Sequence, residues 1–492
     1  MKLLQNIFPG WLLLLFVVQP SIAQQHVSTR VPAETWLAFE QTSDAGFTVD
    51  LADQLIEQCV PSGASAVLVI YDGAVLFSWG DVEKRYMCHS CRKSFMSMLY
   101  GIHVAEELID LEKSLAELGI DDKQQLSAEE QTATVSDLLK SRSGIYHPAA
   151  YEPQSMKNNR PERGSHIPGE HWWYNNWDFN TSLTILEQEA GEKFFESFDE
   201  RIAQPIGLQD FRLGDGYYHL EPESMHPAYP FRLSARDMAR IGLLMANGGR
   251  WADQQIIPPD WVRESTEPHS ETGNWNGFSG YGFMWWIGTA GGCKVFSAQG
   301  TGGNSIYIIS DRKLVFVFRA DTFKGGSTGS RPRWNIVNAV LDAQSGAATG
   351  DPKLVEVEDT TQLPDPVELS DEYLAQFPLD IRRHLPESLP AAIRDEPVRI
   401  ALEGDVMVVY TRRPPALQFD LIPLAEDRFW ICTMDEIGVI DRDRAGNPRR
   451  FVVRGDLEAH IKELENAGQT EEAARERLRL LEVFPQGPSE DR

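Results

Sequence analysis

Six residues near the start of the chain, "CHSCRK" at positions 88–93, contain two overlapping patterns that could each do chemistry. Ser90 and Lys93 form an SxxK pattern, which is typical of an activated serine nucleophile. Cys88 and Cys91 form a CxxC pattern, which is typical of redox or metal-binding sites. We expect only one of the two patterns to be functional, so the question is which of them has partners elsewhere in the chain.

The serine and lysine need a particular setting to react. A serine hydroxyl requires a neighbouring base, and lysine can be that base only where burial or a nearby positive charge lowers its pKa. Helical spacing of apolar residues from Ser90 to Leu111 predicts a helix that begins near Ser90. Its first turn would place Ser90 and Lys93 on one face, and its free N–H groups would point toward an oxyanion formed there.

The cysteine pattern finds no partners of this kind. Zinc needs about four ligands, and the sequence has no second CxxC and no HxxxH. A thioredoxin-like role would need a βαβ unit, which the surrounding pattern does not supply. A disulfide between Cys88 and Cys91 and a pair of reduced, packed thiols are the remaining alternatives, and the packed thiols are favoured. We expect neither a metal nor an organic cofactor.

A second motif lies in the loop "GEHWWYNNWDFN", where Tyr174 and Asn176 form a YxN pattern. Alone, these two side chains could simply satisfy loop backbone groups. The density of aromatic residues around them suggests an apolar acyl pocket, with the alternative that the rings belong mostly to the core. The aromatic residues concerned are Trp172, Trp173, Tyr174, Trp177 and Phe179.

Taken in order, several segments resemble the serine β-lactamase and penicillin-binding-protein superfamily, particularly its class C-like branch of esterases, D-aminopeptidases and amide hydrolases. The matching segments are "HSCRKSFMSMLYGIHVAEELIDL", "VSDLLKSRSGI", "PGEHWWYNNWDFN", "LSARDMARIGLLMANGGRW" and "AQGTGGNSIYIISD". They cover about residues 45–345. The resemblance implies an α+β fold with a β-lactamase/transpeptidase-like antiparallel sheet and a helical insert, whose edge strands we expect to come from opposite ends of the domain.

The resemblance also implies roles for the motif residues. Ser90 would be the acylated nucleophile and Lys93 its base. Tyr174 would relay a proton to the leaving group, and Asn176 would hydrogen-bond the substrate or orient the lysine.

The third motif of the superfamily usually reads Lys-Thr-Gly or His-x-Gly, but here Ala298, Gln299 and Gly300 occupy its place. The backbone N–H groups of Ser90 and of a residue near Thr301 would form the oxyanion hole, where each donor is worth ~3 kcal/mol of barrier. The missing cation is the group that would hold a substrate carboxylate.

Three replacements for that cation are open: Lys294, His147 or an arginine from a loop. Because the usual cation is missing and the sequence fixes none of these replacements, we predict ester or amide hydrolysis on a neutral or aromatic-tolerant acyl compound. The alternatives are a D-amino-acid peptidase or β-lactamase acting on cell-wall-type substrates, and a non-catalytic binding or sensor protein on the same fold.

The remaining segments predict the organisation of the chain. Residues 1–23 have the anatomy of a signal peptide, with Lys2, an apolar core from Trp11 to Val18 and a small-residue end at Ala23. The predicted units are a signal peptide (1–23), a β-lactamase-like domain (24–345), a linker (346–372), a small all-β domain of about five or six strands (373–455) and a helical tail broken at Ala467 and Gly468 (456–492).

Composition restricts the partners. A net charge of −27 repels nucleic acid and anionic lipid, and no segment after the signal peptide is apolar enough to span a membrane. We therefore predict a secreted or periplasmic hydrolase of a small ester, amide or peptide. The sequence leaves its oligomeric state open.

Overall fold

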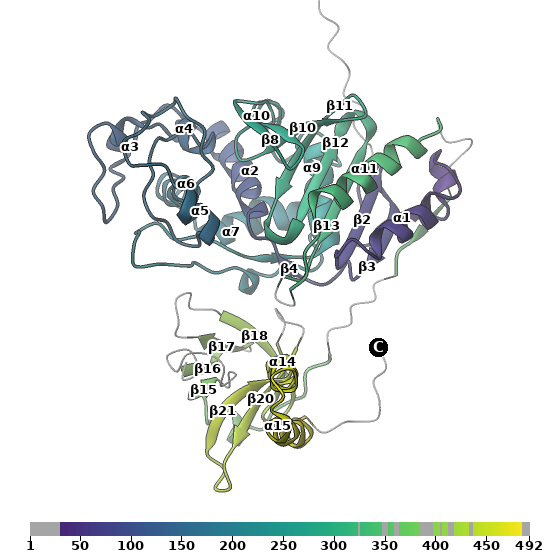
Figure 1. Ribbon diagram of the computed structural model, residues 1–492, viewed down its shortest axis with the longest axis vertical. Helices are drawn as coiled ribbons and strands as arrows, with labels where there is room; N and C mark the ends of the chain where they lie inside the picture. The colour runs from purple at the N-terminus through teal and green to yellow at the C-terminus, as the bar shows by residue number, and fades with distance from the viewer. Residues whose placement is uncertain are drawn as a thin grey trace, which may run out of the picture.

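The computed structural model describes residues 30–322, 325–346, 353–358, 364–383, 397–403, 406–411, 418–431 and 436–484. The predicted signal peptide and Cys432 lie outside these residues. Helices and strands in the described part form the predicted α+β architecture, with a large domain and a smaller one (Figure 1).

A ten-stranded sheet forms the centre of the larger domain (Figure 1). Adjacent strands are antiparallel except β1 and β3, which pair in parallel. In order across the sheet the strands are β14 (Leu354–Glu356), β1 (Leu37–Phe39), β3 (Ala74–Gly80), β2 (Ala66–Tyr71), β13 (Leu314–Arg319), β12 (Ser305–Ile309), β11 (Cys293–Gln299), β10 (Trp286–Ala290), β9 (Phe278–Tyr281) and β8 (Ser270–Trp275).

Strands from the two ends of the domain meet inside the sheet, not at its edges as the sequence suggested. Strand β2 pairs along its whole length with β13. Both strands are almost continuously apolar and buried, which suits central strands covered on both faces and not edge strands. Pairing of these two strands closes the domain around its helical insert.

Helices cover both faces of the sheet. Gly242 of α9 lies against Ile306 and Val315, while Trp334 of α11 packs on the ring of Tyr307, and neighbouring residues of a strand point to opposite faces. The longer helices of the domain are α1 (Leu51–Cys59), which packs on α11 (Ser330–Ala343), α2 (Cys91–Ala105), α6 (Asn176–Ala190) and α9 (Ala235–Ala246). The shorter ones are α3 (Leu115–Leu118), α4 (Val135–Leu139), α5 (Gln154–Asn159), α7 (Phe194–Phe198), α8 (Gln204–Ile206) and α10 (Pro259–Ser265).

Helix α2 is the central helix of the insert. Every residue from Cys91 to His103 is buried, including the polar ones, so the helix is enclosed on all sides. The predicted start near Ser90 is confirmed. The helix ends at Ala105, before the predicted Leu111, because the chain turns at Glu107, which has a left-handed φ of 59°.

The smaller domain is a closed seven-stranded barrel, and its interior is filled by apolar side chains such as Ile400, Phe429 and Phe451. Sequence patterns missed its first strand because three of that strand's five residues are charged. The strands are β15 (Leu379–Arg383), β16 (Pro397–Glu403), β17 (Val406–Thr411), β18 (Gln418–Ala425), β19 (Arg428–Ile431), β20 (Glu436–Arg442) and β21 (Pro448–Val453).

Short elements complete the chain. Helices α14 (Arg454–Asn466) and α15 (Thr470–Val483) are separated at the predicted break, and α12 (Asp371–Leu374) precedes the barrel. Two small pairs join β4 (Tyr86–Met87) to β5 (Arg232–Leu233) and β6 (Arg250–Trp251) to β7 (Gln254–Gln255). Within the described ranges, no helix combines the length and apolar character that crossing a membrane requires.

The packing of α2 on α10 gives a stability prediction. A Cβ at Gly101 would lie 2.3 Å from Cδ1 of the rigid Trp261 indole. We expect Gly101→Ala to lower the free energy of unfolding by about 1–3 kcal/mol in urea titrations, because the clash outweighs the helix preference of alanine. In a Trp261→Leu background, Gly101→Ala should cost less stability than it does in wild type, because the indole that it clashes with is gone. Unchanged stability of the single variant would contradict this packing.

Candidate active site

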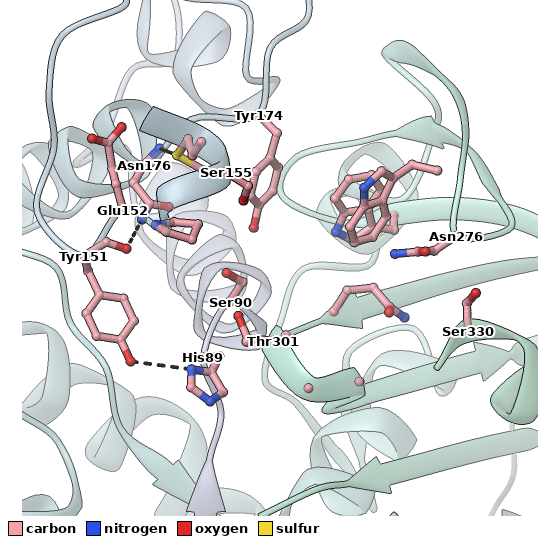
Figure 2. Close-up of a pocket in the computed structure, with 18 of the residues that line it drawn as sticks. His89, Ser90, Tyr151, Glu152, Ser155, Tyr174, Asn176, Asn276, Thr301 and Ser330 are labelled. Atoms are coloured by element: carbon pink, nitrogen blue, oxygen red, sulfur yellow. Dashed lines mark hydrogen bonds between the residues drawn. The ribbon is translucent and has the colours of Figure 1, made fainter. Parts of the chain in front are cut away.

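The segment before α2 holds Ser90 in a tight turn. Strand β4 pairs with β5, and the N–H of Cys88 donates to the carbonyl of Phe231 at 2.9 Å. His89 then takes a left-handed φ of 49°, a strained conformation for a residue with a Cβ. Ser90 follows as the residue that precedes the first turn of α2, with its side chain at the cavity (Figure 2).

Lys93 lies at the centre of a cluster of polar atoms, one turn along α2. Its Nζ is 3.0 Å from Ser90 Oγ and 2.6 Å from the hydroxyl of Tyr174. The same Nζ lies 2.9 Å from Asn176 Oδ1, so the structure brings the SxxK and YxN motifs together. Burial lowers the pKa of Lys93 well below its ordinary value, and the charge of Arg92 lowers it further.

Tyr174 and Asn176 are placed by the start of α6. The side chain of Asn175 caps this helix by accepting from the N–H of Asp178 at 3.0 Å. The amide of Asn176 donates to the carbonyl of Tyr151 at 2.6 Å, which fixes its oxygen toward Lys93. Burial raises the pKa of Tyr174 to about 12, so its hydroxyl keeps its proton at neutral pH.

Two residues that line the cavity, Ser90 and Thr301, have backbone N–H groups that are open to a substrate. Among the described residues, nothing accepts a hydrogen bond from the N–H of Ser90 or of Thr301. Gly300 brings the two together, because a Cβ there would lie only 2.5 Å from the carbonyl oxygen of Cys88. The end of β11 can therefore approach the Ser90 turn this closely only with glycine at this position.

Gln299 occupies the place of the third motif, and its side chain is hydrogen-bonded by Arg333. Nη1 of Arg333, on α11, donates to Gln299 Oε1 at 2.9 Å and to Ser305 Oγ at 3.1 Å. Arg333 is 3% exposed, lines the cavity and makes no ion pair with a carboxylate among the described residues. A cation thus lies at the third motif, although it comes from a distant helix.

The cations considered from the sequence lie elsewhere. His147 is buried beside Glu130, with Nε2 3.2 Å from its carboxylate. Lys294 pairs with Glu267 at 2.6 Å. Neither His147 nor Lys294 lines the cavity. Arg333 was not predicted, because the arginine was expected to come from a loop. A helical pattern is visible in Ile336, Val337 and Val340, and it would have placed Arg333 on the same buried face.

The cavity has a volume of about 1110 Å³ and is lined by both aromatic and polar side chains. One wall is aromatic: Trp275 stacks on Trp286 at 4.0 Å, and Trp286 lies 5.4 Å from the ring of Tyr174. Polar side chains also line the cavity, among them Glu152, Asn159 and Glu221. Trp172 and Trp173 also line the cavity, whereas Trp177 and Phe179 are fully buried core residues.

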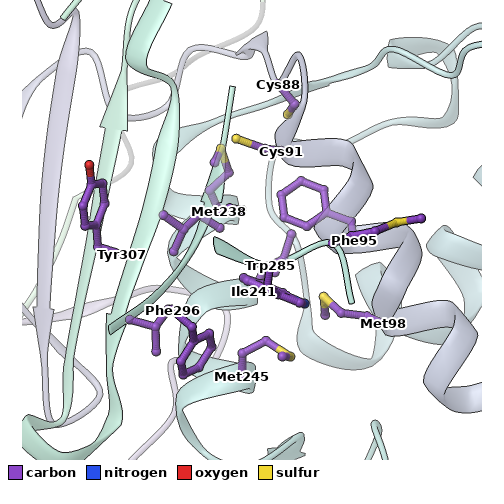
Figure 3. Packing of buried hydrophobic residues seen from close by; sticks show 14 of the residues in the cluster. Cys88, Cys91, Phe95, Met98, Met238, Ile241, Met245, Trp285, Phe296 and Tyr307 are labelled. Atoms are coloured by element: carbon purple, nitrogen blue, oxygen red, sulfur yellow. The ribbon is translucent and has the colours of Figure 1, made fainter. Parts of the chain in front are cut away.

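The two cysteines flanking Ser90 are packing residues. Cys88 and Cys91 are buried free thiols, and Figure 3 shows them in the apolar cluster beside Phe95 and Met238. Burial raises the pKa of the Cys88 thiol to about 11 and that of Cys91 to about 12, which makes both poor nucleophiles. No group of three potential metal ligands of the His, Cys, Asp or Glu type occurs among the described residues.

The close approach at Gly300 gives a second prediction. Gly300→Ala should slow acylation of Ser90 by about 10- to 100-fold, because the added methyl would push the Thr301 N–H away from the Ser90 turn. The rate of labelling by a fluorophosphonate measures this. Gly329→Ala is the matched control, since it also lines the cavity and its Cβ would meet no atom closer than 3.5 Å. Equal rates for both variants would contradict the geometry.

The chain is similar to known proteins over most of the larger domain. The beta-lactamase family model matches residues 52–341, more than half of the chain. A search of curated proteins finds no significant match. Among solved structures, the chain is similar to an octameric penicillin-binding protein homologue from Pyrococcus abyssi (16% identity, 80% of this chain, 94% of that chain, TM-score 0.47).

Two further structures are similar at the same level. One is a D-stereospecific amidohydrolase from Streptomyces sp. (17% identity, 59% of this chain, 97% of that chain, TM-score 0.45). The other is a D-amino acid amidase from Ochrobactrum anthropi SV3 (15% identity, 60% of this chain, 97% of that chain, TM-score 0.44). The chain belongs to the beta-lactamase family and has the fold of that family's serine hydrolases.

Proposed function

We propose that this protein hydrolyses an ester or amide bond through an acyl-enzyme on Ser90. The observation that carries the proposal is the position of Lys93 Nζ, within hydrogen-bond distance of Ser90 Oγ and of the Tyr174 hydroxyl at the edge of a large cavity. Burial lowers the pKa of the Lys93 amine and so favours its neutral form, which can accept the serine proton.

Acylation begins with transfer of the Ser90 proton to Lys93. Neutral Lys93 takes the proton of Ser90 as Oγ bonds to the substrate carbonyl carbon, and the oxyanion accepts hydrogen bonds from the two N–H groups at Ser90 and Thr301. The Tyr174 hydroxyl then gives its proton to the leaving alcohol or amine as the bond to the carbonyl carbon breaks. Lys93 returns its proton to Tyr174, 2.6 Å away.

Deacylation repeats these steps with water as the nucleophile. Water loses a proton to the Tyr174 and Lys93 pair as it attacks the acyl ester. The pair then gives that proton to Ser90 Oγ as the ester bond breaks. Asn176 accepts a hydrogen bond from Lys93 throughout, so the amine stays aimed at the reacting atoms. A positioned base of this kind contributes about 10²–10⁴-fold to the rate.

The aromatic wall supports an apolar or aromatic acyl group as the substrate's recognised part. Trp275 is 43% exposed although it stacks on Trp286, so one indole face is open to a bound ring. The N–H of Trp334 donates to the carbonyl of Asn276 at 2.8 Å, which fixes the hairpin that carries Trp275. A flat apolar group would replace water on this surface at little conformational cost.

A second candidate is a substrate that carries a carboxylate, such as a D-amino-acid peptide or a β-lactam. Arg333 favours it, because a buried guanidinium without a carboxylate partner among the described residues lies at the cavity beside Gln299. Its Nη1 is already bonded to protein groups, so a substrate would have to bind at Nη2. We rank it below the first candidate for that reason.

The proposed function is tested with wild type and Ser90→Ala. We expect a fluorophosphonate to label wild type on Ser90, and we expect turnover of p-nitrophenyl esters with aromatic acyl groups to exceed that of D-alanyl peptides and a chromogenic β-lactam. Ser90→Ala should lose labelling, and its turnover should fall by about 10³-fold or more.

Two outcomes would overturn parts of this proposal. Faster turnover of the β-lactam or D-alanyl peptide than of the esters would favour the second candidate. Folded wild type that is neither labelled nor active would favour a non-catalytic binding protein on this fold.

The aromatic wall gives a separate prediction. Trp275→Ala should raise KM for a naphthoyl ester about fivefold to tenfold, since loss of one stacking partner costs about 1 kcal/mol. The KM for an acetyl ester should stay the same, because the acetyl group does not reach the indole. Trp430→Ala, which removes an indole from the barrel, is the control and should change neither value. Parallel changes for both esters would argue against a ring-binding wall.

We also propose that the protein acts outside the cytoplasm. It is supported by the charge, apolar core and small-residue end of the first 23 residues, and the described residues do not include them.

A further inference from the structure

Helix α2 contains a second buried cation, directly beside the lysine of the site. Arg92 is 1% exposed, as is Lys93. It makes no ion pair with a carboxylate among the described residues, and its Nε and Nη2 have no hydrogen-bond partner there. Burying a charge without a counter-ion costs several kcal/mol, so a structural role alone accounts poorly for an arginine here.

The contacts of Arg92 fix its position. Its Nη1 donates to the carbonyl of His89 at 2.9 Å, within the strained turn that presents Ser90. Its guanidinium lies between two aromatic rings, 5.3 Å from the centre of Tyr151 and 5.0 Å from that of Tyr229. Cation–π contacts of this kind stabilise a charge without neutralising it.

The groups around Arg92 and Lys93 do not neutralise the positive charge of Arg92. Lys93 faces the neutral side chains of Ser90, Tyr174, Asn176 and Phe179, and the thiol of Cys91 adjoins it. Arg92 faces Tyr151, Tyr229 and the turn at His89, with Arg232 and Arg319 nearby. On the Tyr151 side, Glu221 accepts from the backbone N–H of Tyr151 and lies 3.0 Å from Nε2 of His219.

We propose that Arg92 is a positioning residue that places a fixed, unneutralised positive charge beside Lys93 and so keeps the lysine uncharged and able to act as the base. The inference rests on the proposed function, since it assigns Lys93 that role. Arg92 touches neither substrate nor reacting atoms in this arrangement. The hydrogen bond from its Nη1 to the carbonyl of His89 also fixes the guanidinium against the Ser90 turn.

The direction of the effect follows from electrostatics. Lys93 acts as base only when deprotonated, so activity falls as the pH drops through the pKa of Lys93. Removing a neighbouring positive charge makes protonation of Lys93 easier and raises that pKa. The acid limb of the pH–rate profile must then move to higher pH.

The experiment measures fluorophosphonate labelling of Ser90 against pH for wild type, Arg92→Met, Arg92→Gln and Arg92→Lys. We expect the midpoint of the acid limb to rise by about one pH unit in the two neutral variants. Arg92→Lys keeps the charge and should keep the midpoint. Arg240→Met removes an equally buried arginine on α9, and the midpoint should not move.

Each outcome separates this inference from the proposed function. Unlabelled wild type would defeat the proposed function. Labelled wild type with the same midpoint in every folded variant, even at a lower overall rate, would show that Arg92 is only structural and would overturn the inference. Arg92→Gln keeps a donor for the His89 carbonyl, and it decides the question should Arg92→Met fail to fold.

Discussion

Burial of the Lys93 amine is the constraint on which the site depends. An ammonium group in this position would lack the water that normally stabilises it, so enclosure favours the neutral amine, which is the form that can accept a proton. Complete enclosure of α2 provides this setting, and the rings of Tyr174 and Phe179 lie 4.2 Å from Nζ. The same packing that stabilises the domain therefore prepares the lysine for chemistry.

A second constraint is the close approach of two distant segments. The Ser90 turn and the end of β11 meet where Gly300 leaves room for the carbonyl of Cys88. Cys91 fills the adjacent space and directs its thiol to the carbonyl of Asn304 at 3.3 Å. The CxxC pattern thus belongs to the architecture of the nucleophile turn: small, apolar sulfur side chains fit where the sheet and the helix come together.

Local patterns predicted many of the elements, and physical reasons explain the failures. The start of α2 was predicted because the apolar spacing that follows Ser90 is strong over a short distance. Strand β15 was missed because charged residues hide its alternation. The prediction that strands from the two ends of the domain lie at the edges of the sheet was wrong, since pairing of β2 with β13 joins segments about 250 residues apart and no local signal reports it.

The sequence by itself determined which residues could do the chemistry, because SxxK and YxN are read from residue type and spacing, and it determined the fold class through the resemblance that these motifs carry. Only the tertiary structure decided how they act. It brought Tyr174 and Asn176 to Lys93, supplied Arg333 from α11 to the third motif, and placed Arg92 between two rings with no carboxylate partner among the described residues. Burial and distance set the charge of a side chain, and both are properties of the packed chain that the order of residues does not display.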